Sequence, residues 1–269
     1  MKYQEFTPSA PLSDYIQLIW IMESESPKEV YPKEKILPDG IVELVFHYKD
    51  PFINYFADGR KLKQPDGFAI SQMSKFIEIE SDGEIGFISV RFYPWGAHHF
   101  FKKPIKSFID DLTDAGELWE GGYQKDLGVL TNLDDREKVN RVEEFLMGKL
   151  NGQKTKKNSD LITDTIKLIR DTRGSLPIDD ICKQTGLSYK QLERYFVSSI
   201  GVSPKVFSRT TRFLHLCHHI GEYENKTMTQ LAYDMGYYDQ AHFNKEFKEF
   251  SGLTPKEYFR QKNISFADF

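Results

Sequence analysis

A segment near the C-terminal end of the chain combines an apolar stripe with side chains that suit the edges of DNA bases. Leu192 and Phe196 lie four residues apart and predict a helix that buries this face in a core. The polar residues on the opposite face and its flanks are Lys190, Gln191, Glu193 and Arg194. Because arginine, lysine and glutamine have the geometry to hydrogen-bond base edges in the major groove, this spacing predicts a base-reading helix.

A second segment repeats this arrangement about fifty residues later. Phe243, Phe247 and Phe250 form its apolar stripe. The polar residues that surround the opposite face are Gln240, His242, Asn244 and Lys245. Asparagine side chains also hydrogen-bond base edges in the major groove. A second base-reading helix is therefore predicted here.

Both segments are parts of one internal repeat, with an offset of 50 residues up to a glycine and 51 after it. In each copy a small residue, Cys182 or Ala232, lies four residues before that glycine, Gly186 or Gly236. A small residue at a close approach, a glycine that ends the first helix and a second amphipathic helix are typical of a helix-turn-helix. Each copy then ends in Ser-Pro or Thr-Pro, a helix start with proline at its first position.

The element that joins the two copies runs from about Ser203 to Ile220 and is predicted to be a helix of about 27 Å. Two recognition helices in successive major grooves on one face of DNA lie about 34 Å apart. A rigid helix of this size can set such a spacing. A single chain is therefore expected to read two half-sites without dimerising.

The chain divides into two parts of different composition. Its 269 residues exceed the roughly 100 to 200 of one domain, and residues 151–158 hold three lysines and no apolar residue, which is typical of a linker. We expect an α+β multidomain protein. Residues 1–150 form a β-rich domain that ends in a helix, residues 151–158 the linker, and residues 159–269 an all-α domain with two helix-turn-helix units.

Compact or alternating apolar runs predict strands in the first part. The runs are 16–22, 41–48, 76–79 and 85–92. The turn at 81–83 predicts a hairpin between the last two strands, and the turn at 38–40 leads into the strand at 41–48. Residues 134–150 carry apolar residues at helical spacing and predict one amphipathic helix or two short ones.

Charge alone does not indicate a nucleic-acid partner. Residues 159–269 hold 15 Lys and Arg against 14 Asp and Glu, whereas the rest of the chain carries a net charge of −5. A strong electrostatic footprint needs a clearly basic domain. The prediction of DNA binding therefore rests on the repeat.

Targeting signals and cofactor motifs are not found in the sequence. It has no apolar run near the roughly 20 residues of a membrane span, and its first ten residues do not form a signal peptide. A cytoplasmic location is therefore expected, with Cys182 and Cys217 as reduced, small core residues. No cofactor, metal or enzymatic activity is predicted. Residues interpreted as structural are Asp39 and Glu43 (turn and strand), His98, His99, His215, His218, His219, Trp20, Trp95 and Trp119.

The region from about Leu161 to Gln261 resembles the DNA-binding domain of AraC/XylS-type transcriptional regulators, above all at 231–248 and 252–258. The resemblance implies two helix-turn-helix units joined by a long helix, with base contacts from both recognition helices. These contacts are carried to Lys190, Gln191, Arg194, Gln240, Asn244 and Lys245. Two residues depart from the family pattern: Cys182 replaces the usual alanine, and Lys245 stands where arginine is frequent, which removes the option of a bidentate contact.

The first domain resembles, at 37–46 and 90–97, the sensor-type region that precedes this domain in such regulators. That resemblance implies a cupin-like domain that binds a small-molecule effector or mediates dimerisation. It also implies an operator of double-stranded DNA, a contact with RNA polymerase and activation more often than repression.

Three functions stay open on the sequence. The leading one is a sequence-specific regulator that responds to a small molecule bound by residues 1–150. The second is an enzyme fused to a DNA-binding module, which lacks support because residues 1–150 contain no phosphate loop, nucleophile elbow or metal-ligand set. The third is a ligand-independent DNA binder whose first domain only forms a homodimer.

Overall fold

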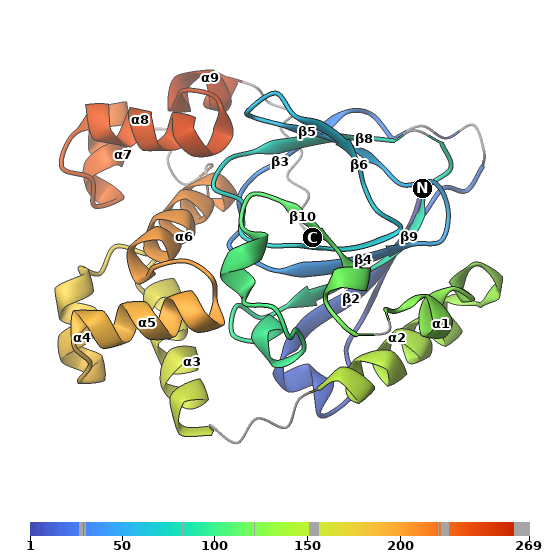
Figure 1. Ribbon diagram of the computed structural model, residues 1–269. Coiled ribbons are helices and arrows are strands. Elements are labelled where there is room, and N and C mark those ends of the chain that lie inside the picture. Colours follow the sequence, from blue (N-terminus) through green and yellow to red (C-terminus); the bar gives the residue numbers. More distant parts are fainter. Residues whose placement is uncertain are drawn as a thin grey trace.

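The computed structural model describes residues 1–26, 29, 31–81, 83–120, 122–150, 156–219, 221 and 226–260. The first part of the chain is a β-rich domain and the second is helical (Figure 1), as predicted. The strands are β1 (Lys2–Phe6), β2 (Ile16–Glu23), β3 (Glu34–Ile36), β4 (Glu43–His47), β5 (Ile53–Phe56), β6 (Lys61–Lys63), β7 (Gly67–Ile70), β8 (Ile77–Glu80), β9 (Gly86–Phe92) and β10 (Leu112–Asp114).

The strands form two antiparallel sheets that face each other. The six-stranded sheet has the order β1-β2-β9-β4-β7-β10, and the four-stranded sheet has the order β3-β8-β5-β6. The six-stranded sheet is buried on both faces, because alternate residues of one strand enter different cores. Ile19 and Ile21 of β2 pack in one core, while Trp20 and Met22 pack in the core between the sheets.

Helices α1 (Gln124–Leu127) and α2 (Asp135–Lys149) cover the outer face of this sheet (Figure 1). One long helix thus closes the first domain. It begins with a capping box, in which the Asp134 side chain accepts from the Glu137 backbone N–H and the Glu137 side chain accepts from that of Asp134. Val139, Val142 and Leu146 are buried in the outer core.

The predicted hairpin at 81–83 is wrong. β8 pairs with β3 and β5, whereas β9 pairs with β2 and β4, so the two strands belong to different sheets. The chain crosses from one sheet to the other, and Glu84 N donates to Asp50 Oδ2 at 2.9 Å just after the turn. Asp82 lies outside the described residues. A turn signal reports a reversal of local direction, but tertiary packing decides which strands then pair.

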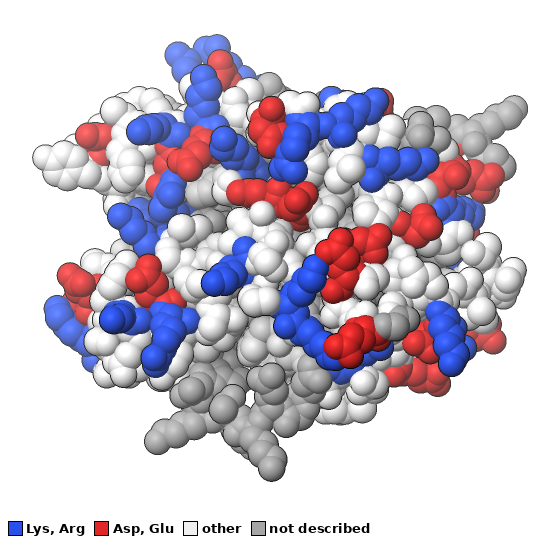
Figure 2. All heavy atoms as spheres, viewed as in Figure 1, with Lys and Arg blue, Asp and Glu red and all other residues white. Residues whose placement is uncertain are grey.

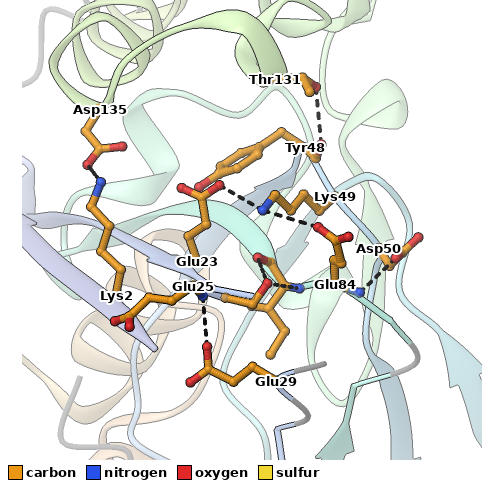
Figure 3. Close-up of polar contacts among 12 residues, drawn as sticks. Lys2, Glu23, Glu25, Glu29, Tyr48, Lys49, Asp50, Glu84, Thr131 and Asp135 are labelled. Carbon is orange, nitrogen blue, oxygen red and sulfur yellow. Dashed lines mark hydrogen bonds and ion pairs between the residues drawn. The ribbon is translucent and has the colours of Figure 1, made fainter. Parts of the chain in front are cut away.

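A polar network closes one end of the β domain (Figure 3). Lys49 Nζ lies 2.9 Å from Glu23 Oε1 and 3.5 Å from Glu84 Oε2, and Lys2 pairs with Asp135 at the start of α2. These residues lie at or beyond the end of β2, the end of β4 and the start of β9. The three strands are antiparallel neighbours. Their opposite ends, at Ile16, Glu43 and Phe92, therefore lie together at the other end of the domain.

The helical domain lies at that other end of the first domain (Figure 1). Its helices are α3 (Lys156–Asp171), α4 (Ile178–Thr185), α5 (Tyr189–Ser199), α6 (Pro204–His218), α7 (Met228–Asp234), α8 (Gln240–Ser251) and α9 (Pro255–Arg260). Because α3 begins at Lys156, the last three residues of the predicted linker are helical, and residues 151–155 lie outside the described part. Among the described residues, no helix has the length and apolarity to cross a membrane.

Helix α6 joins the pair α4–α5 to the pair α7–α8 (Figure 1). It has 15 residues and ends at His218, with His219 as its C-cap, so its length is about 22 Å rather than the expected 27 Å. Its start is as predicted: the Ser203 side chain accepts from the Val206 backbone N–H, and Pro204 occupies the first position. A helix of this length keeps both helix-turn-helix units in contact with its sides.

Candidate nucleic-acid interface and interdomain cavity

The first helix-turn-helix unit consists of α4 and α5. Gly186 ends α4 in the left-handed conformation, with φ of 69°. Helix α5 begins with a capping box between Ser188 and Gln191, in which Gln191 Oε1 accepts from Ser188 N at 3.0 Å. Leu192 and Phe196 are fully buried, as predicted. Gln191 was predicted to read bases. In the structure its side chain caps the start of α5.

The opposite face of α5 is open to solvent. Lys190 and Arg194 are exposed, and Glu193 is half-buried on the flank. The Arg194 guanidinium lies 5.3 Å from the centre of the Tyr195 ring.

The second unit consists of α7 and α8. Thr227 and Gln230 form a capping box at the start of α7, and the Asp239 side chain accepts from His242 N at 2.7 Å at the start of α8. The three phenylalanines of the predicted stripe are buried. His242 and Lys245 are exposed, whereas Gln240 and Asn244 are half-buried.

Gln240 is engaged within the unit, because its Oε1 accepts from Thr229 Oγ1 at 2.7 Å. The turn before α8 is one residue longer than its counterpart in the first unit. The additional residue is Tyr238, whose side chain is 86% exposed. Sequence reasoning did not single out Tyr238, although the change of offset from 50 to 51 marks its position.

A cleft of about 720 Å³ separates the two units. Its basic and aromatic lining residues are Tyr189, Lys205, Arg209, Arg212, His242 and Lys245. The predicted residues His242 and Lys245 thus face the start of α5 across the cleft. The other six predicted residues do not line it, and they lie on the two recognition helices outside the cleft.

A buried ion pair fixes the second unit to α6. Glu246 is 3% exposed, and its two carboxylate oxygens accept from Arg209 Nε and from the Tyr237 hydroxyl, each at 2.6 Å. Arg209 also donates to Glu249 at 3.0 Å. Burial and the neighbouring Glu246 carboxylate raise the pKa of Tyr237, so its hydroxyl stays protonated and donates.

Basic and acidic side chains are interspersed over the face of the molecule that Figure 2 shows. Neither colour forms one large continuous patch on this face. This distribution agrees with the near balance of charges in the second half of the sequence. The geometry of the units, rather than a basic surface, marks the candidate interface.

A second hollow, of about 590 Å³, lies between the two sheets of the first domain and helix α6. Most of its walls are apolar side chains of the first domain: Trp20, Val45, Phe52, Phe68, Ile70, Ile77, Ile79 and Phe87. Helix α6 contributes Phe207, Thr210, Thr211, Leu214, His215 and His218. We call this hollow the interdomain cavity. Trp20, predicted to pack in the core, is 3% exposed and also lines the cavity.

One group of polar side chains in and behind the cavity wall is uncharged. His47 Nε2 lies 2.8 Å from Gln64 Oε1, and Gln64 Nε2 donates to Asn54 Oδ1 at 2.7 Å. Burial lowers the pKa of His47 to about 4, so its ring is uncharged near neutral pH. The Ser71 hydroxyl is also buried in the wall, and no hydrogen-bond partner is found for it among the described residues.

Charged groups line the part of the cavity next to the second domain. Arg91 donates to Glu43 Oε1 at 2.7 Å and to Asp39 Oδ2 at 3.0 Å. Asp39 and Glu43 are therefore turn and strand residues, as predicted, but they are also the partners of a buried arginine. Burial raises the pKa of the Glu43 carboxyl. Arg170 of α3 is exposed there and forms no hydrogen bond or ion pair with any described residue.

The described histidines and cysteines do not form a metal site. Among the described residues, no three His, Cys, Asp or Glu side chains converge in a way that would hold a metal ion. His98 is half-buried, and desolvation together with the neighbouring His99 lowers its pKa to about 4. Cys217 is buried as predicted, whereas Cys182 is only partly buried and packs against the core of the first unit.

Two family models match the chain. Residues 4–114 match a domain of unknown function, DUF6597, and residues 181–261 match a helix-turn-helix domain. The second match spans both units and the joining helix that the structure places between them. Residues 181–261 thus form an AraC-type helix-turn-helix domain. Domains of this type occur in a family of DNA-binding transcriptional regulators, which are not enzymes.

Curated relatives resemble the AraC-type domain of this chain. Uncharacterized HTH-type transcriptional regulators of Staphylococcus aureus, from strains MSSA476 and COL, are 32% identical over 83 residues. The match covers 31% of this chain and only 11% of the length of each relative.

Several solved structures align with most of this chain at low sequence identity. ToxT from Vibrio cholerae aligns with 97% of this chain and 98% of its own, at 13% identity and a TM-score of 0.46. ToxT with a bound unsaturated fatty acid aligns with 92% of this chain and 96% of its own, at 14% identity and a TM-score of 0.42. The AraC-like transcriptional activator CuxR aligns with 82% of this chain and 90% of its own, at 13% identity and a TM-score of 0.26.

Proposed function

We propose that this chain regulates transcription by binding a specific DNA operator with α5 and α8 in two adjacent major grooves. The observation that carries the proposal is the repeated unit itself, because two capped, amphipathic helices turn polar faces to solvent on either side of one joining helix. The residues proposed to contact bases are Lys190, Gln191, Glu193, Arg194, Gln240, His242, Asn244 and Lys245.

The cleft between the units supplies the sequence-independent part of this binding. Lys205 is exposed in the cleft, and the Arg212 guanidinium lies beside the turn of the second unit, 3.4 Å from the Gly236 carbonyl oxygen. We assign these cations to the phosphates of the DNA strand that passes between the two grooves, since phosphate contacts position a protein without reading sequence.

Selection of the full-length chain on random duplex DNA tests the proposal. A recovered motif with two half-sites about one helical turn apart is expected. Binding to the recovered site should weaken with salt, and Lys205→Ala should reduce the slope of log K against log salt by about one. Recovery of no motif, with binding that depends on salt alone, would contradict sequence-specific regulation.

We further propose that the interdomain cavity binds a small-molecule effector. Its volume of about 590 Å³ suits a small organic ligand, and its wall combines apolar side chains with polar and charged groups. Arg170 is a cation in the cavity wall without an anionic partner at hydrogen-bonding distance among the described residues, so we assign the effector to apolar molecules that carry one anionic group.

A dye of that chemistry, 1-anilinonaphthalene-8-sulfonate, tests the cavity. Dye fluorescence should rise on binding, and Arg170→Ala should weaken binding by about tenfold, as loss of one charge-assisted contact predicts. Lys167→Ala is the control, since Lys167 is exposed on the same helix and does not line the cavity. Equal binding by both variants would remove Arg170 from the site.

Activation, a contact with RNA polymerase and dimerisation stay predictions from the family resemblance. A reporter gene behind the selected operator gives the sign of regulation. Unfolding measured at several protein concentrations tests for a dimer, because only an oligomer gains stability with concentration. A concentration-dependent melting temperature without any effect of the dye would favour the third function, a first domain that only dimerises.

A further inference from the structure

One loop of the first domain contacts both helix-turn-helix units. It comprises residues 71–76, all the residues between β7 and β8, and we call it the bridging loop. Gln72 is buried, and its Nε2 donates to the Ile200 carbonyl oxygen at 3.2 Å. Four residues later, Phe76 N donates to the Phe250 carbonyl oxygen at 3.0 Å.

The two contacts fall within one residue of equivalent places in the repeat. Ile200 immediately follows α5, and Phe250 is the penultimate residue of α8, so the loop binds the C-terminal end of each recognition helix. Ile200 corresponds to Ser251 by the offset of 51. The Ser251 carbonyl oxygen accepts from Lys35 Nζ at 3.1 Å, and Lys35 in turn lies 4.0 Å from the centre of the Phe76 ring.

The glycines that follow the recognition helices permit this approach. Gly201 and Gly252 both adopt positive φ, 93° and 77°, and both face the first domain. A side chain at Gly201 would meet Ile105 at 3.0 Å and Lys106 N at 3.1 Å, and one at Gly252 would overlap the Phe76 ring. The two ends are thus packed against the first domain in the same way.

The middle of the bridging loop is fixed independently of either unit. Ser74 donates to the Asp110 carboxylate twice, from its backbone N–H at 2.6 Å and from its hydroxyl at 2.7 Å. Asp110 lies shortly after the short helix Ile105–Phe108, the element that Gly201 approaches. The loop is therefore held at three points, and its two outer points hold the two recognition helices.

The same loop forms part of the wall of the interdomain cavity. Ser71 and Met73 line the cavity, and the Ser71 hydroxyl is buried there without a hydrogen-bond partner among the described residues. A ligand that displaces these side chains acts on a segment whose neighbouring residues touch both units. A close-packed interface transmits a small displacement of one side chain to its neighbours, because packed side chains switch between discrete arrangements.

We propose that the bridging loop fixes the relative placement of the two recognition helices and changes it when the interdomain cavity is occupied. The effect on DNA rests on the proposed function, because only a protein that reads two half-sites gains or loses affinity with their spacing. The placement itself is a property of the protein without DNA. Its test is therefore independent of DNA binding.

The experiment measures the distance between spin labels at equivalent exposed positions, Lys190→Cys on α5 and Ala241→Cys on α8, in the full chain. Cys182→Ala removes the partly buried thiol, with alanine as in the second unit, and Cys217 is buried. The expected result is one narrow distance distribution. Gln72→Ala combined with Phe76→Ala should widen it at least twofold. Lys75→Ala should not, because Lys75 is exposed in the same loop and forms no hydrogen bond or ion pair with either unit among the described residues.

Occupancy of the cavity is tested on the same labelled protein. Addition of 1-anilinonaphthalene-8-sulfonate should shift the mean distance, and the shift should disappear in the Gln72→Ala, Phe76→Ala protein. An unchanged width in that protein overturns the role of the loop. A dye that binds without shifting the distance overturns the coupling to the cavity. Failure to select any DNA motif leaves both results in place and contradicts the proposed function alone.

Discussion

The two helix-turn-helix units share a sequence pattern but differ in how they are held. The second unit is joined to α6 through the buried carboxylate of Glu246, whose equivalent in the first unit is Tyr195. The first unit packs instead through apolar residues against α3 and α6, with no buried ion pair at that place among the described residues. A repeated unit can thus keep its exposed polar face while its attachment to the rest of the protein varies.

The largest effect is expected from removing the attachment of the second unit. Glu246→Ala should lower the free energy of unfolding by about 3 kcal/mol or more, because it leaves Arg209 and the Tyr237 hydroxyl without their buried acceptor. Urea unfolding measures this change. Glu249→Ala is the matched control, since Glu249 binds the same arginine from an exposed position and should cost less than about 1 kcal/mol.

Tyr195→Phe completes the comparison in the first unit. It should change stability by less than about 1 kcal/mol, because the Tyr195 hydroxyl has no partner among the described residues. Equal losses in the two units would show that the buried ion pair does not distinguish them.

The next largest effect is expected on operator binding by the first unit. Arg194→Ala should weaken binding to the selected operator by about tenfold to a hundredfold without loss of fold, as loss of a bidentate base contact predicts. Lys183→Ala removes the same charge from exposed α4 and is the control. Unchanged operator affinity in a folded Arg194→Ala protein would exclude Arg194 from the contacts.

A smaller effect is expected at the equivalent place in the second unit. The residue that corresponds to Arg194 there is Lys245, and a lysine acts as a point charge. Lys245→Ala should weaken binding by about threefold to tenfold, and Lys245→Arg should tighten binding where a guanine faces it. A Lys245→Ala loss greater than that of Arg194→Ala would reverse the order of the two units.

The smallest effect on the fold is expected from Cys182→Ala, which should change stability by less than about 1 kcal/mol. Burial raises the pKa of Cys217 to about 12 and also raises that of Cys182, which is only partly buried. Reaction with a thiol reagent should therefore speed up at Cys182 as the pH rises and its thiolate forms, and reach Cys217 only on unfolding. A fast thiol that persists in Cys182→Ala would contradict this difference.

The helical domain was predictable in detail from the sequence. Its repeat and its buried stripes depend on residues three or four apart, and the structure places Ser203 and the stripes of α5 and α8 as the spacing predicts. The length of α6 was overestimated, since helical periodicity does not locate a helix end to within a turn. The eight proposed contact residues lie on α5 and α8. Their roles depend on contacts with DNA, which a pattern within the chain does not specify.

The β domain was predictable only in part. Its strands follow from apolar runs, but the hairpin at 81–83 was wrong because both neighbouring strands had a choice of partners in two sheets. The cavity lining includes Phe207 and Arg170 from the second domain, and no local pattern indicates that these residues meet Trp20 and His47.

The sequence by itself determined the repeated helix-turn-helix units and the division into a β-rich and a helical part, because both arise from contacts between residues close in the chain. The tertiary structure alone decided the interdomain cavity, the attachment of Glu246 to Arg209 and the contact of the bridging loop with both units. Those features join residues far apart in the sequence, such as Gln72 and Ile200, whose meeting depends on how whole elements pack.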